Sequence, residues 1–278
     1  MQFSAAFNSN DPLKIFEQLT PVETAIAKQV RELVQTQVSP FINDAFFNED
    51  KSVDLLRILG QLNMFGGDIA YRYGGPTISP VAYGLIAYEL EKIDSGLRTI
   101  FSVIGGLCMK SIDLFGSEEQ KQQYLPLLNC GKIAAAFALT EINYGSDIAH
   151  MESTATKVNG GYTLNGKKRW IGLAPYADII IVWAKCEDEK TRAFIVEKDS
   201  PGLTITPIKN KISLRVAVQG EIHLNNVLLS DKNLLAKSDG LNSAFTCLNH
   251  ARYGIAWGAL GAAHDCLDTC LSYSKERK

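Results

Sequence analysis

Phe137-Ala-Leu-Thr-Glu141, followed three residues later by Gly145-Ser146-Asp147, joins an apolar strand to a polar turn that contains glycine. Such a turn exposes backbone N–H groups and hydroxyls, which suit the polar edge of a heterocycle and a phosphate group. A strand that simply ends in a capped loop would explain the same residues, and taken alone they favour that simpler interpretation. The rest of the chain therefore has to decide between the two.

Upstream of this segment, to about Lys132, the sequence has the spacing of amphipathic helices. Apolar residues recur at intervals of three and four positions from Pro21 to Val38, which indicates a helix. Thr20 before Pro21, with Glu23 three positions later, has the form of a capping box with proline at the first helical position. The same signals predict further helices over Ser52–Leu62, Ser79–Ile93 and Leu97–Leu114, and one that begins after Ser117.

Downstream, from Ala134 to about Leu229, short apolar strands alternate with turn signals. The expected turns are Asn159-Gly160-Gly161, Asn165-Gly166 and Pro201-Gly202. Turns at such close spacing are typical of a small β-barrel or sandwich. A doubly wound parallel sheet would contradict this prediction.

From about Gly240 the helical spacing returns and continues to the last residue without a capping glycine or a closing proline. Leu241, Phe245, Leu248 and Ile255 lie near one stripe of this helix. We therefore predict an α+β chain with three parts. They are an N-terminal helical domain (1–132), a middle β domain (133–235) and the first helix of a C-terminal helical domain (236–278).

The composition excludes several classes of function. A net charge of −2 over 278 residues gives no general attraction to nucleic acid or to an anionic membrane. Cys266 and Cys270 have no nearby metal-ligand partners, so we expect no metal site. Met1–Thr20 resembles neither a secretory signal nor a transit peptide, which favours a cytoplasmic location, or the mitochondrial matrix in a eukaryote.

Several motifs in order resemble the acyl-CoA dehydrogenase family. The opening segment is similar to the flavin-binding signature of that family, and Trp170-Ile171 matches its Trp-Ile pair. The similarity covers nearly the whole chain and is closest to the glutaryl-CoA dehydrogenase branch. That branch is matched at Asp11-Pro-Leu13, Glu17–Thr20, Val81–Leu85, Asp94-Ser-Gly96, Gly116–Gln120, Ser213-Leu-Arg215 and Ala251–Gly258.

The resemblance implies FAD as the cofactor. The residues expected to hold it are Phe137, Leu139, Thr140, Gly145, Ser146, Trp170, Ile171, Gly172 and, reaching a neighbouring subunit, Arg277. The backbone and hydroxyl at Thr140 should bond the flavin pyrimidine edge, Ser146 the pyrophosphate, and Trp170 should pack along the ring system. For Trp170 and Arg277 alone, a core aromatic and a basic helix end are the simpler interpretations.

Two positions depart from the family pattern. Gly172 stands where dehydrogenases usually have a threonine or serine whose hydroxyl reaches flavin N5, and Ile142 replaces the usual proline. Related short-chain acyl-CoA oxidases can carry Trp-Ile-Gly, so an oxidase remains an alternative. The electron acceptor is then an electron-transfer flavoprotein or oxygen.

The substrate is expected to be an acyl-CoA, with glutaryl-CoA favoured. The resemblance assigns substrate contacts to Arg98, Thr99, Ser146 and Arg252. Arg98 corresponds to an arginine that faces the distal carboxylate of the glutaryl chain, a task suited to a fixed guanidinium fork. A lone arginine on a helix is otherwise most often a solvated surface residue.

The family base that removes the α-proton lies in a Tyr-Glu-Gly or similar segment, and these 278 residues contain no Tyr-Glu-Gly. Glu141 belongs to the flavin loop and is not a substitute. We therefore expect the chain alone to be inactive in α,β-dehydrogenation and in the decarboxylation that follows with glutaryl-CoA. A non-catalytic truncated paralogue that binds FAD, acyl-CoA or a partner subunit is a further alternative. The family is typically tetrameric, so a homo-oligomer is expected.

Overall fold

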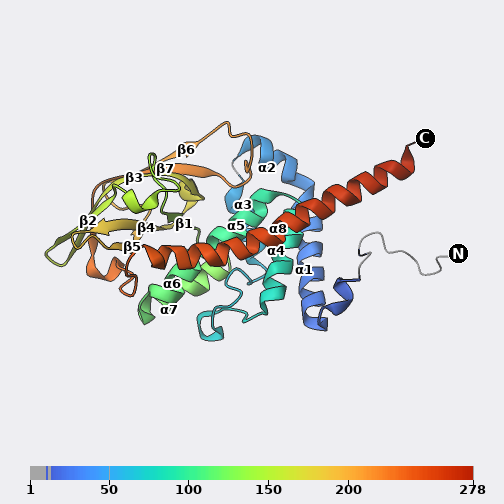
Figure 1. Ribbon diagram of the computed structural model, residues 1–278, viewed down its shortest axis with the longest axis horizontal. Coiled ribbons are helices and arrows are strands. Elements are labelled where there is room, and N and C mark those ends of the chain that lie inside the picture. The colour runs from blue at the N-terminus through green and yellow to red at the C-terminus, as the bar shows by residue number, and fades with distance from the viewer. Residues whose placement is uncertain (1–10, 12–13, 50, 278) are drawn as a thin grey trace.

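The computed structural model describes residues 11, 14–49 and 51–277 of the chain (Figure 1). Most of the segment Met1–Thr20 used for the targeting prediction, and Pro12-Leu13 of one matched motif, lie outside these residues. Within the described part, no helix has both the length and the apolarity that crossing a membrane would require.

The N-terminal part is helical, as predicted. Thr20 and Glu23 form the expected capping box, and Ser117 with Gln120 forms a second one. Each box satisfies backbone N–H groups that a helix start leaves unpaired. The helices are α1 (Pro21–Gln37), α2 (Ile42–Asn48), α3 (Ser52–Gly60), α4 (Pro80–Glu91), α5 (Ser95–Phe101), α6 (Lys110–Phe115) and α7 (Glu118–Asn129).

The predicted single helix over Leu97–Leu114 differs from the structure in its middle. Between α5 and α6 lies a π-helical segment, η4 (Ser102–Met109). It holds Gly105, whose added Cβ would lie 1.9 Å from the carbonyl oxygen of Phe65. The wider π turn and the missing side chain together let the backbone of this rod approach the loop before α4.

The middle part is one curled seven-stranded sheet in the order β1-β4-β2-β3-β7-β6, with β5 paired to β4 (Figure 1). The strands are β1 (Ala135–Ala138), β2 (Thr154–Val158), β3 (Gly161–Gly172), β4 (Ile179–Cys186), β5 (Thr191–Glu197), β6 (Leu203–Ile208) and β7 (Gln219–Ser230). Antiparallel pairs dominate; β4 pairs in parallel with β1 and β2.

Of the three predicted turns, two are confirmed and one is wrong. The β2–β3 hairpin turns at Gly160 and the β6 strand begins after Pro201-Gly202, both with glycines at positive φ. Asn165-Gly166 instead lies inside β3, at a shift in its register with β7. A Cβ at Gly166 would lie 2.2 Å from the Ser153 hydroxyl oxygen, so the glycine serves close packing there.

Both faces of β1 and β4 are buried, because the sheet separates two hydrophobic cores. One core joins the N-terminal helices to Phe137, Ile181 and Trp183. The other fills the curl of the sheet around Ile180 and Phe194. Strands buried on both faces have continuous apolar sequences, as β1 and β4 do. The loop after β1 therefore begins at the border between the two cores.

A single helix, α8 (Leu241–Glu276), crosses the helical domain, and its last turns project from the body (Figure 1). Its buried face consists of small residues. The ring of Trp257 fills the space left by Gly84 on α4, and a Cβ at Gly261 would lie 2.2 Å from the carbonyl oxygen of Tyr88. Of the apolar stripe noted in the sequence, Phe245 and Ile255 are exposed, whereas Leu241 and Leu248 are partly buried against the core.

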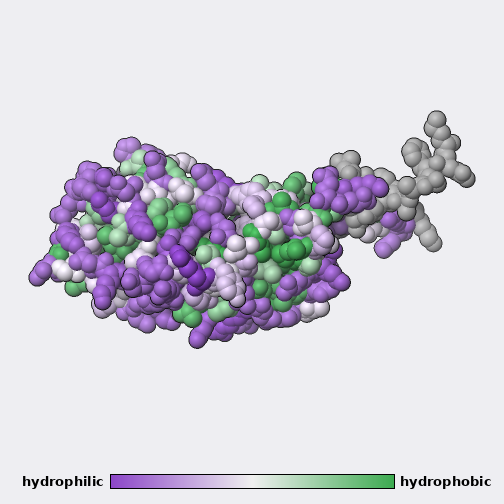
Figure 2. All heavy atoms as spheres, turned by 90° about the horizontal axis from the view of Figure 1, so that it is seen from below, coloured by the Kyte–Doolittle hydropathy of each residue, from purple (hydrophilic) through white to green (hydrophobic). Residues whose placement is uncertain are grey.

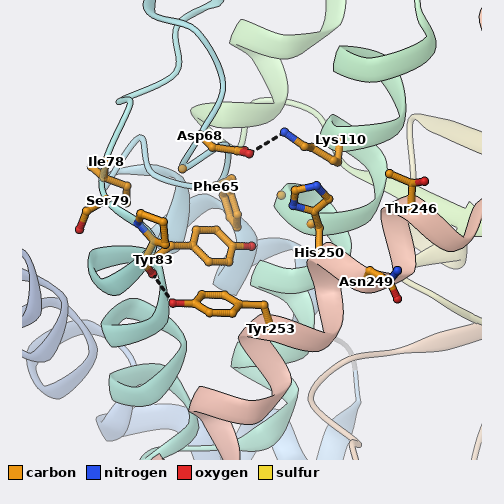
Figure 3. A pocket seen from close by; sticks show the side chains of 14 residues that line it. Phe65, Asp68, Ile78, Ser79, Tyr83, Lys110, Thr246, Asn249, His250 and Tyr253 are labelled. Carbon is orange, nitrogen blue, oxygen red and sulfur yellow. Dashed lines mark hydrogen bonds and ion pairs between the residues drawn. The ribbon is translucent and has the colours of Figure 1, made fainter. Parts of the chain in front are cut away.

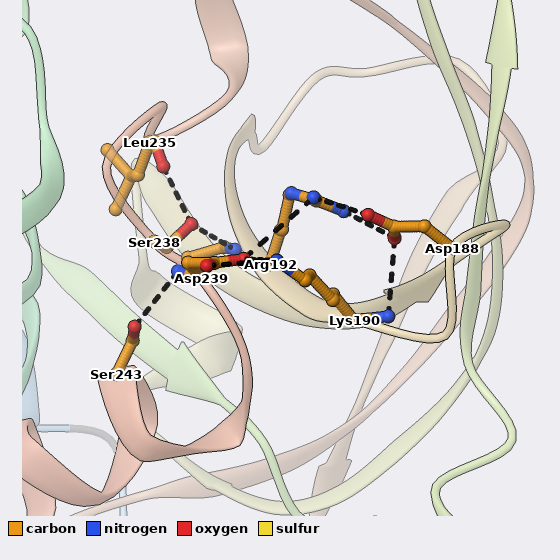
Figure 4. A network of polar contacts seen from close by, with 8 residues as sticks. Asp188, Lys190, Arg192, Leu235, Ser238, Asp239 and Ser243 are labelled. Carbon is orange, nitrogen blue, oxygen red and sulfur yellow. Dashed lines mark hydrogen bonds and ion pairs between the residues drawn. The ribbon is translucent and has the colours of Figure 1, made fainter.

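A polar network fixes the start of α8 to the β domain (Figure 4). Asp188 accepts two hydrogen bonds from Arg192, at 2.6 and 2.7 Å, and the bonds from Arg192 lower the pKa of Asp188 to about 2. Lys190 pairs with Asp239, whose N–H donates to Ser243 in the first turn of α8. The β4–β5 turn therefore sets where the long helix begins.

Apolar side chains are also exposed along the distal half of α8, at Leu260 and Leu267. In the view of Figure 2 the surface of the body is largely hydrophilic, with green apolar patches. Outward-facing apolar residues over this length mark a face that is suited to contact another surface.

We predict that Gly261→Ala destabilises the chain by about 1–3 kcal/mol, because the new methyl group must displace the Tyr88 backbone. Without that contact, alanine would stabilise a helix by about 1 kcal/mol relative to glycine. Urea unfolding measures the difference, with Cys266→Ala at an exposed position of the same helix as the control. A rise in stability for Gly261→Ala would contradict the close approach of α8 to α4.

Candidate functional site

A buried ion pair organises the loop after β1. The ammonium group of Lys168 on β3 donates to Glu141 Oε1 at 2.9 Å and to the carbonyl oxygen of Leu139 at 3.0 Å. The side chain of Lys168 is 0% exposed. Glu141 also accepts hydrogen bonds from the backbone N–H groups of Glu152 and Ser153, at 2.6 and 2.9 Å. One carboxylate thus joins β3, the end of β1 and both ends of the 141–153 loop.

The surroundings keep this pair charged at neutral pH. Burial raises the pKa of Glu141, but the charge of Lys168 and the hydrogen bonds from Ser153 and Glu152 outweigh it, so the pKa lies below its ordinary value. Burial lowers the pKa of Lys168 to about 8, although Glu141 opposes the shift. A charged pair at this depth is stable only when its remaining hydrogen bonds are made, as they are here.

Trp170 sits on a bulge at the end of β3. Between Lys168 and Ile171, β3 has one more residue than the facing part of β7. Trp170, in this bulge, has a positive φ of 60°. The bulge leaves Ile171 buried and Trp170 50% exposed, so a core position for Trp170 is wrong. A bulky residue held in a rarely occupied backbone conformation points to a functional constraint.

The structure brings the end of β1 and the bulge together. The N–H of Arg169 donates to the carbonyl oxygen of Thr140 at 3.0 Å, which places Thr140 beside Trp170. Phe137 and Leu139 are buried below this edge. Gly145 and Ser146 lie exposed on the loop held by Glu141.

The helical domain meets this edge through η4. A Cβ added at Gly172 would touch Val103 at 3.4 Å, an ordinary contact distance. Leu173, which follows, adopts the left-handed conformation and donates its N–H to the carbonyl oxygen of Val218 at 2.7 Å. The end of β3 therefore faces η4, which continues directly from α5, the helix that carries Arg98.

Arg98 is only 8% exposed, so its interpretation as a solvated surface arginine is wrong. Its Nε donates to Glu91 Oε2 at 2.5 Å. No hydrogen bond within the described residues takes up its terminal nitrogens. Next to it, the Thr99 hydroxyl donates to the carbonyl oxygen of Ser95.

The helix α8 closes over Arg98 through its glycine face. A Cβ at Gly258 would lie 3.2 Å from Cδ of Arg98, and one at Gly254 would lie 3.4 Å from the Ser102 hydroxyl oxygen. That hydroxyl is buried and has no hydrogen-bond partner in the described part of the chain. A guanidinium and a free hydroxyl one turn apart thus lie under α8.

The two remaining arginines lie apart from these groups. Arg252 is exposed on α8, with its guanidinium bonded to Asn249 at 2.8 Å. Arg277 follows the last turn of α8, at the projecting end of the helix and far from the β domain (Figure 1).

Three family models match in the order of the parts. They are the acyl-CoA dehydrogenase N-terminal domain over residues 20–132, its middle domain over 136–227 and its C-terminal domain over 238–278. An acyl-CoA dehydrogenase of Bacillus subtilis is 34% identical over 264 residues. That alignment covers 93% of this chain and 70% of the relative. The chain belongs to the acyl-CoA dehydrogenase family.

Solved structures agree. Glutaryl-CoA dehydrogenase from Mycobacterium smegmatis has a TM-score of 0.93 at 41% identity, covering 97% of this chain and 70% of that one. A structure of glutaryl-CoA dehydrogenase from that organism in complex with FADH2 has a TM-score of 0.94 at 38% identity, covering 97% and 69%. A glutaryl-CoA dehydrogenase bound to glutaryl-CoA has a TM-score of 0.86 at 31% identity, covering 94% and 68%.

The match spans only part of the related chains. It covers 45% of a second Bacillus subtilis relative, a probable acyl-CoA dehydrogenase, which is 33% identical. The acyl-CoA dehydrogenase family and its fold are established for the matched residues. Activity and substrate are taken up as proposals below.

Three residues that shape the site are not among those predicted from the sequence, namely Lys168, Glu91 and Ser102. The strand pattern does signal Lys168. It lies four positions after the apolar Leu164, so both side chains point to the same buried face of β3. A charge on that face requires a partner. Glu91 lies seven positions before Arg98, across a helix break that spacing rules do not bridge. Nothing in the sequence marks the Ser102 hydroxyl as unpaired.

We predict that Glu141→Gln costs about 3–5 kcal/mol, because it leaves the Lys168 charge buried without its partner. The double variant Glu141→Gln/Lys168→Met should recover part of that loss. Because the folded pKa of Glu141 lies below its ordinary 4.5, its contribution is complete above that pH and is lost as the pH falls through the folded pKa. Urea unfolding at a series of pH values measures both effects, and additive single losses would show that the pair does not interact.

Proposed function

We propose that this chain is the FAD-binding and acyl-CoA-binding part of a dehydrogenase of the glutaryl-CoA type, which carries out α,β-dehydrogenation followed by decarboxylation, and that the chain alone is inactive. The observation that carries the proposal is the buried Arg98, whose terminal nitrogens are free under the glycine face of α8. Glu91 holds the guanidinium by its Nε and leaves the two terminal nitrogens available to bind a second carboxylate. The complex of a related glutaryl-CoA dehydrogenase with glutaryl-CoA supports this choice of substrate.

The residues fit the expected cofactor. An exposed Trp170 on a strained bulge offers a flat apolar face next to the backbone edge at Thr140. Ser146, on the loop that Glu141 holds, supplies a hydroxyl for a phosphate, and Gly172 supplies a backbone N–H. Bound FAD would accept the hydride that leaves the β-carbon of the acyl chain when the α-proton is removed.

The residues of this chain position and shield the reactants. Thr140 and Trp170 would orient the flavin, while Val103 limits the space beside Gly172. Arg98 and Thr99 would hold the far end of the acyl chain, which fixes its reacting carbons by distance. We infer that these residues do not remove the α-proton, because the two acids described here, Glu141 and Glu91, are already paired with Lys168 and Arg98.

An oxidase remains the second candidate, and one observation favours it. Among the described residues, Val103 alone lies within 4 Å of a Cβ built at Gly172, so the space there permits a side chain that the sequence does not supply. Without that hydroxyl, the flavin edge is open to a small molecule such as oxygen. Reoxidation of the reduced flavin by oxygen, compared with an electron-transfer flavoprotein, separates the two reactions.

Two features support self-association of this chain. Arg277 ends a projecting helix and is solvent-exposed, which suits contact with the cofactor of another subunit (Figure 1). The exposed Leu260 and Leu267 on the same helix supply apolar area for such an interface.

We predict that the purified chain takes up FAD with micromolar or weaker affinity and that glutaryl-CoA does not bleach it. Trp170→Ala should weaken FAD binding by about 2- to 12-fold, the loss expected for one aromatic contact of 0.5–1.5 kcal/mol. Quenching of flavin fluorescence measures the affinity, and Tyr71→Ala, an exposed aromatic of the helical domain, is the control. Bleaching by substrate would refute the inferred lack of a base, and an unchanged affinity would remove Trp170 from the flavin site.

We predict that Arg98→Gln weakens glutaryl-CoA binding by about one to two decades, the loss of one charge-assisted contact of 1.5–3 kcal/mol. The affinity for butyryl-CoA, which lacks the distal carboxylate, should fall much less. Calorimetric titration of the FAD-loaded chain with both thioesters gives the comparison, and Arg57→Gln, at an exposed arginine of α3, is the control. Equal losses for the two thioesters would show that Arg98 does not read the distal carboxylate.

A further inference from the structure

A cavity of about 490 Å³ lies between the loop before α4, the start of α4, η4 and α8 (Figure 3). On α8 it is lined by Thr246, Asn249, His250 and Tyr253, which share one face of the helix. None of the cofactor or substrate residues predicted from the sequence lines it. The cavity is therefore distinct from the site described above, and its volume is that of a small-molecule site.

One buried group in this cavity lacks a partner. The Tyr83 hydroxyl is buried and makes no hydrogen bond to any described residue. The Tyr83 ring packs on Phe101 with centroids 4.8 Å apart, and a Cβ at Gly105 would lie 3.3 Å from the hydroxyl oxygen. Burial, reinforced by the charge of Asp68, raises the pKa of Tyr83, so the group remains a hydrogen-bond donor at neutral pH. Buried hydroxyls are normally paired, and an acceptor is what this one lacks.

The charges around the cavity disfavour an anion. The Lys110 ammonium, whose side chain is 8% exposed, is 2.6 Å from Asp68 Oδ2 and 3.4 Å from Asp113 Oδ2. Two carboxylates thus surround this ammonium, and the Lys121 ammonium lies 3.9 Å from Asp113 Oδ1 as well. Burial and the neighbouring charge of Lys110 lower the pKa of His250, so its ring is neutral at physiological pH. The charges of these side chains are therefore already paired with one another, which leaves no free cation among them for an anionic ligand and favours a ligand without net charge.

The other walls are apolar or already satisfied. Phe65, Ile78 and Pro80 present carbon atoms to the cavity. The hydroxyl of Tyr253, the second tyrosine of the lining, donates to the carbonyl oxygen of Pro80 at 2.9 Å (Figure 3). The ring of Tyr253 is therefore available as an apolar surface, whereas its hydroxyl is not a free donor.

We propose that this cavity binds a neutral aromatic compound that carries a carbonyl oxygen, with the oxygen accepting from the Tyr83 hydroxyl and the ring between Phe65, Pro80 and Tyr253. The proposal does not rest on the acyl-CoA function, since it uses a different face of α8. The cavity is lined by η4 and α8. These two segments also border Arg98, so an occupant would contact helices that enclose the proposed acyl-CoA site.

The test uses benzamide as the neutral probe and benzoate as its anionic counterpart of equal size. Calorimetric titration of the full chain should show saturable binding of benzamide at least tenfold tighter than that of benzoate. Tyr83→Phe should weaken benzamide about 2- to 12-fold, because it removes one neutral hydrogen bond and keeps the ring. Tyr253→Phe, the matched control, should change the affinity less than twofold, because its hydroxyl serves Pro80.

A second variant keeps the test informative if Tyr83→Phe perturbs folding. Thr246 is exposed at the rim on α8, so Thr246→Trp should fill the cavity from the surface and abolish benzamide binding while circular dichroism stays unchanged. The proposal is overturned if the wild-type chain shows no saturable benzamide binding, as it would if another polypeptide filled the cavity. Equal affinity for benzamide and benzoate, or undiminished binding by a folded Tyr83→Phe or Thr246→Trp chain, would also overturn it.

Discussion

The arrangement of the cofactor edge depends on one buried contact, the ion pair between Lys168 and Glu141. Lys168 is enclosed in the sheet, and Glu141 lies three residues beyond the end of β1. A charged ammonium in that position is tolerable only beside a carboxylate, so the loop must return to satisfy it. The path of the loop that carries Ser146 follows from that requirement.

The second constraint is the close approach of α8 to α4. Small residues on both helices replace the usual large apolar contacts, so the backbones meet directly at Gly261 and Tyr88. This approach is what encloses Arg98 and Glu91 in a helical domain that would otherwise leave them in water. A glycine face thereby converts an ordinary surface arginine into a buried, oriented one.

The sequence predicted the order of the three parts and most helix starts, because caps and hydrophobic spacing act locally. Asn165-Gly166 was assigned to a turn, since the same dipeptide serves hairpins and bulges and only the neighbouring Ser153 decides between them. The positions of Thr140 and Trp170 came from a family resemblance. Their actual juxtaposition depends on a bulge that no spacing rule contains. Lys168, Glu91 and the Tyr83 cavity depend on contacts between distant segments, which one sequence does not encode in readable form.

The π-helical segment η4 carries a consequence for how such a chain can diverge. Each residue advances an α-helix by about 100°, so a segment wound at a different pitch sets the angle between the residues on either side of it. Deleting one residue between Ser102 and Met109 would rotate Arg98 about the axis of the continuous helix formed by α5, η4 and α6, relative to the β domain. Arg98 itself would be unchanged. The length of η4 therefore sets the direction in which Arg98 points. Substrate specificity in this architecture can change through an insertion or a deletion in that segment, without a substitution at Arg98.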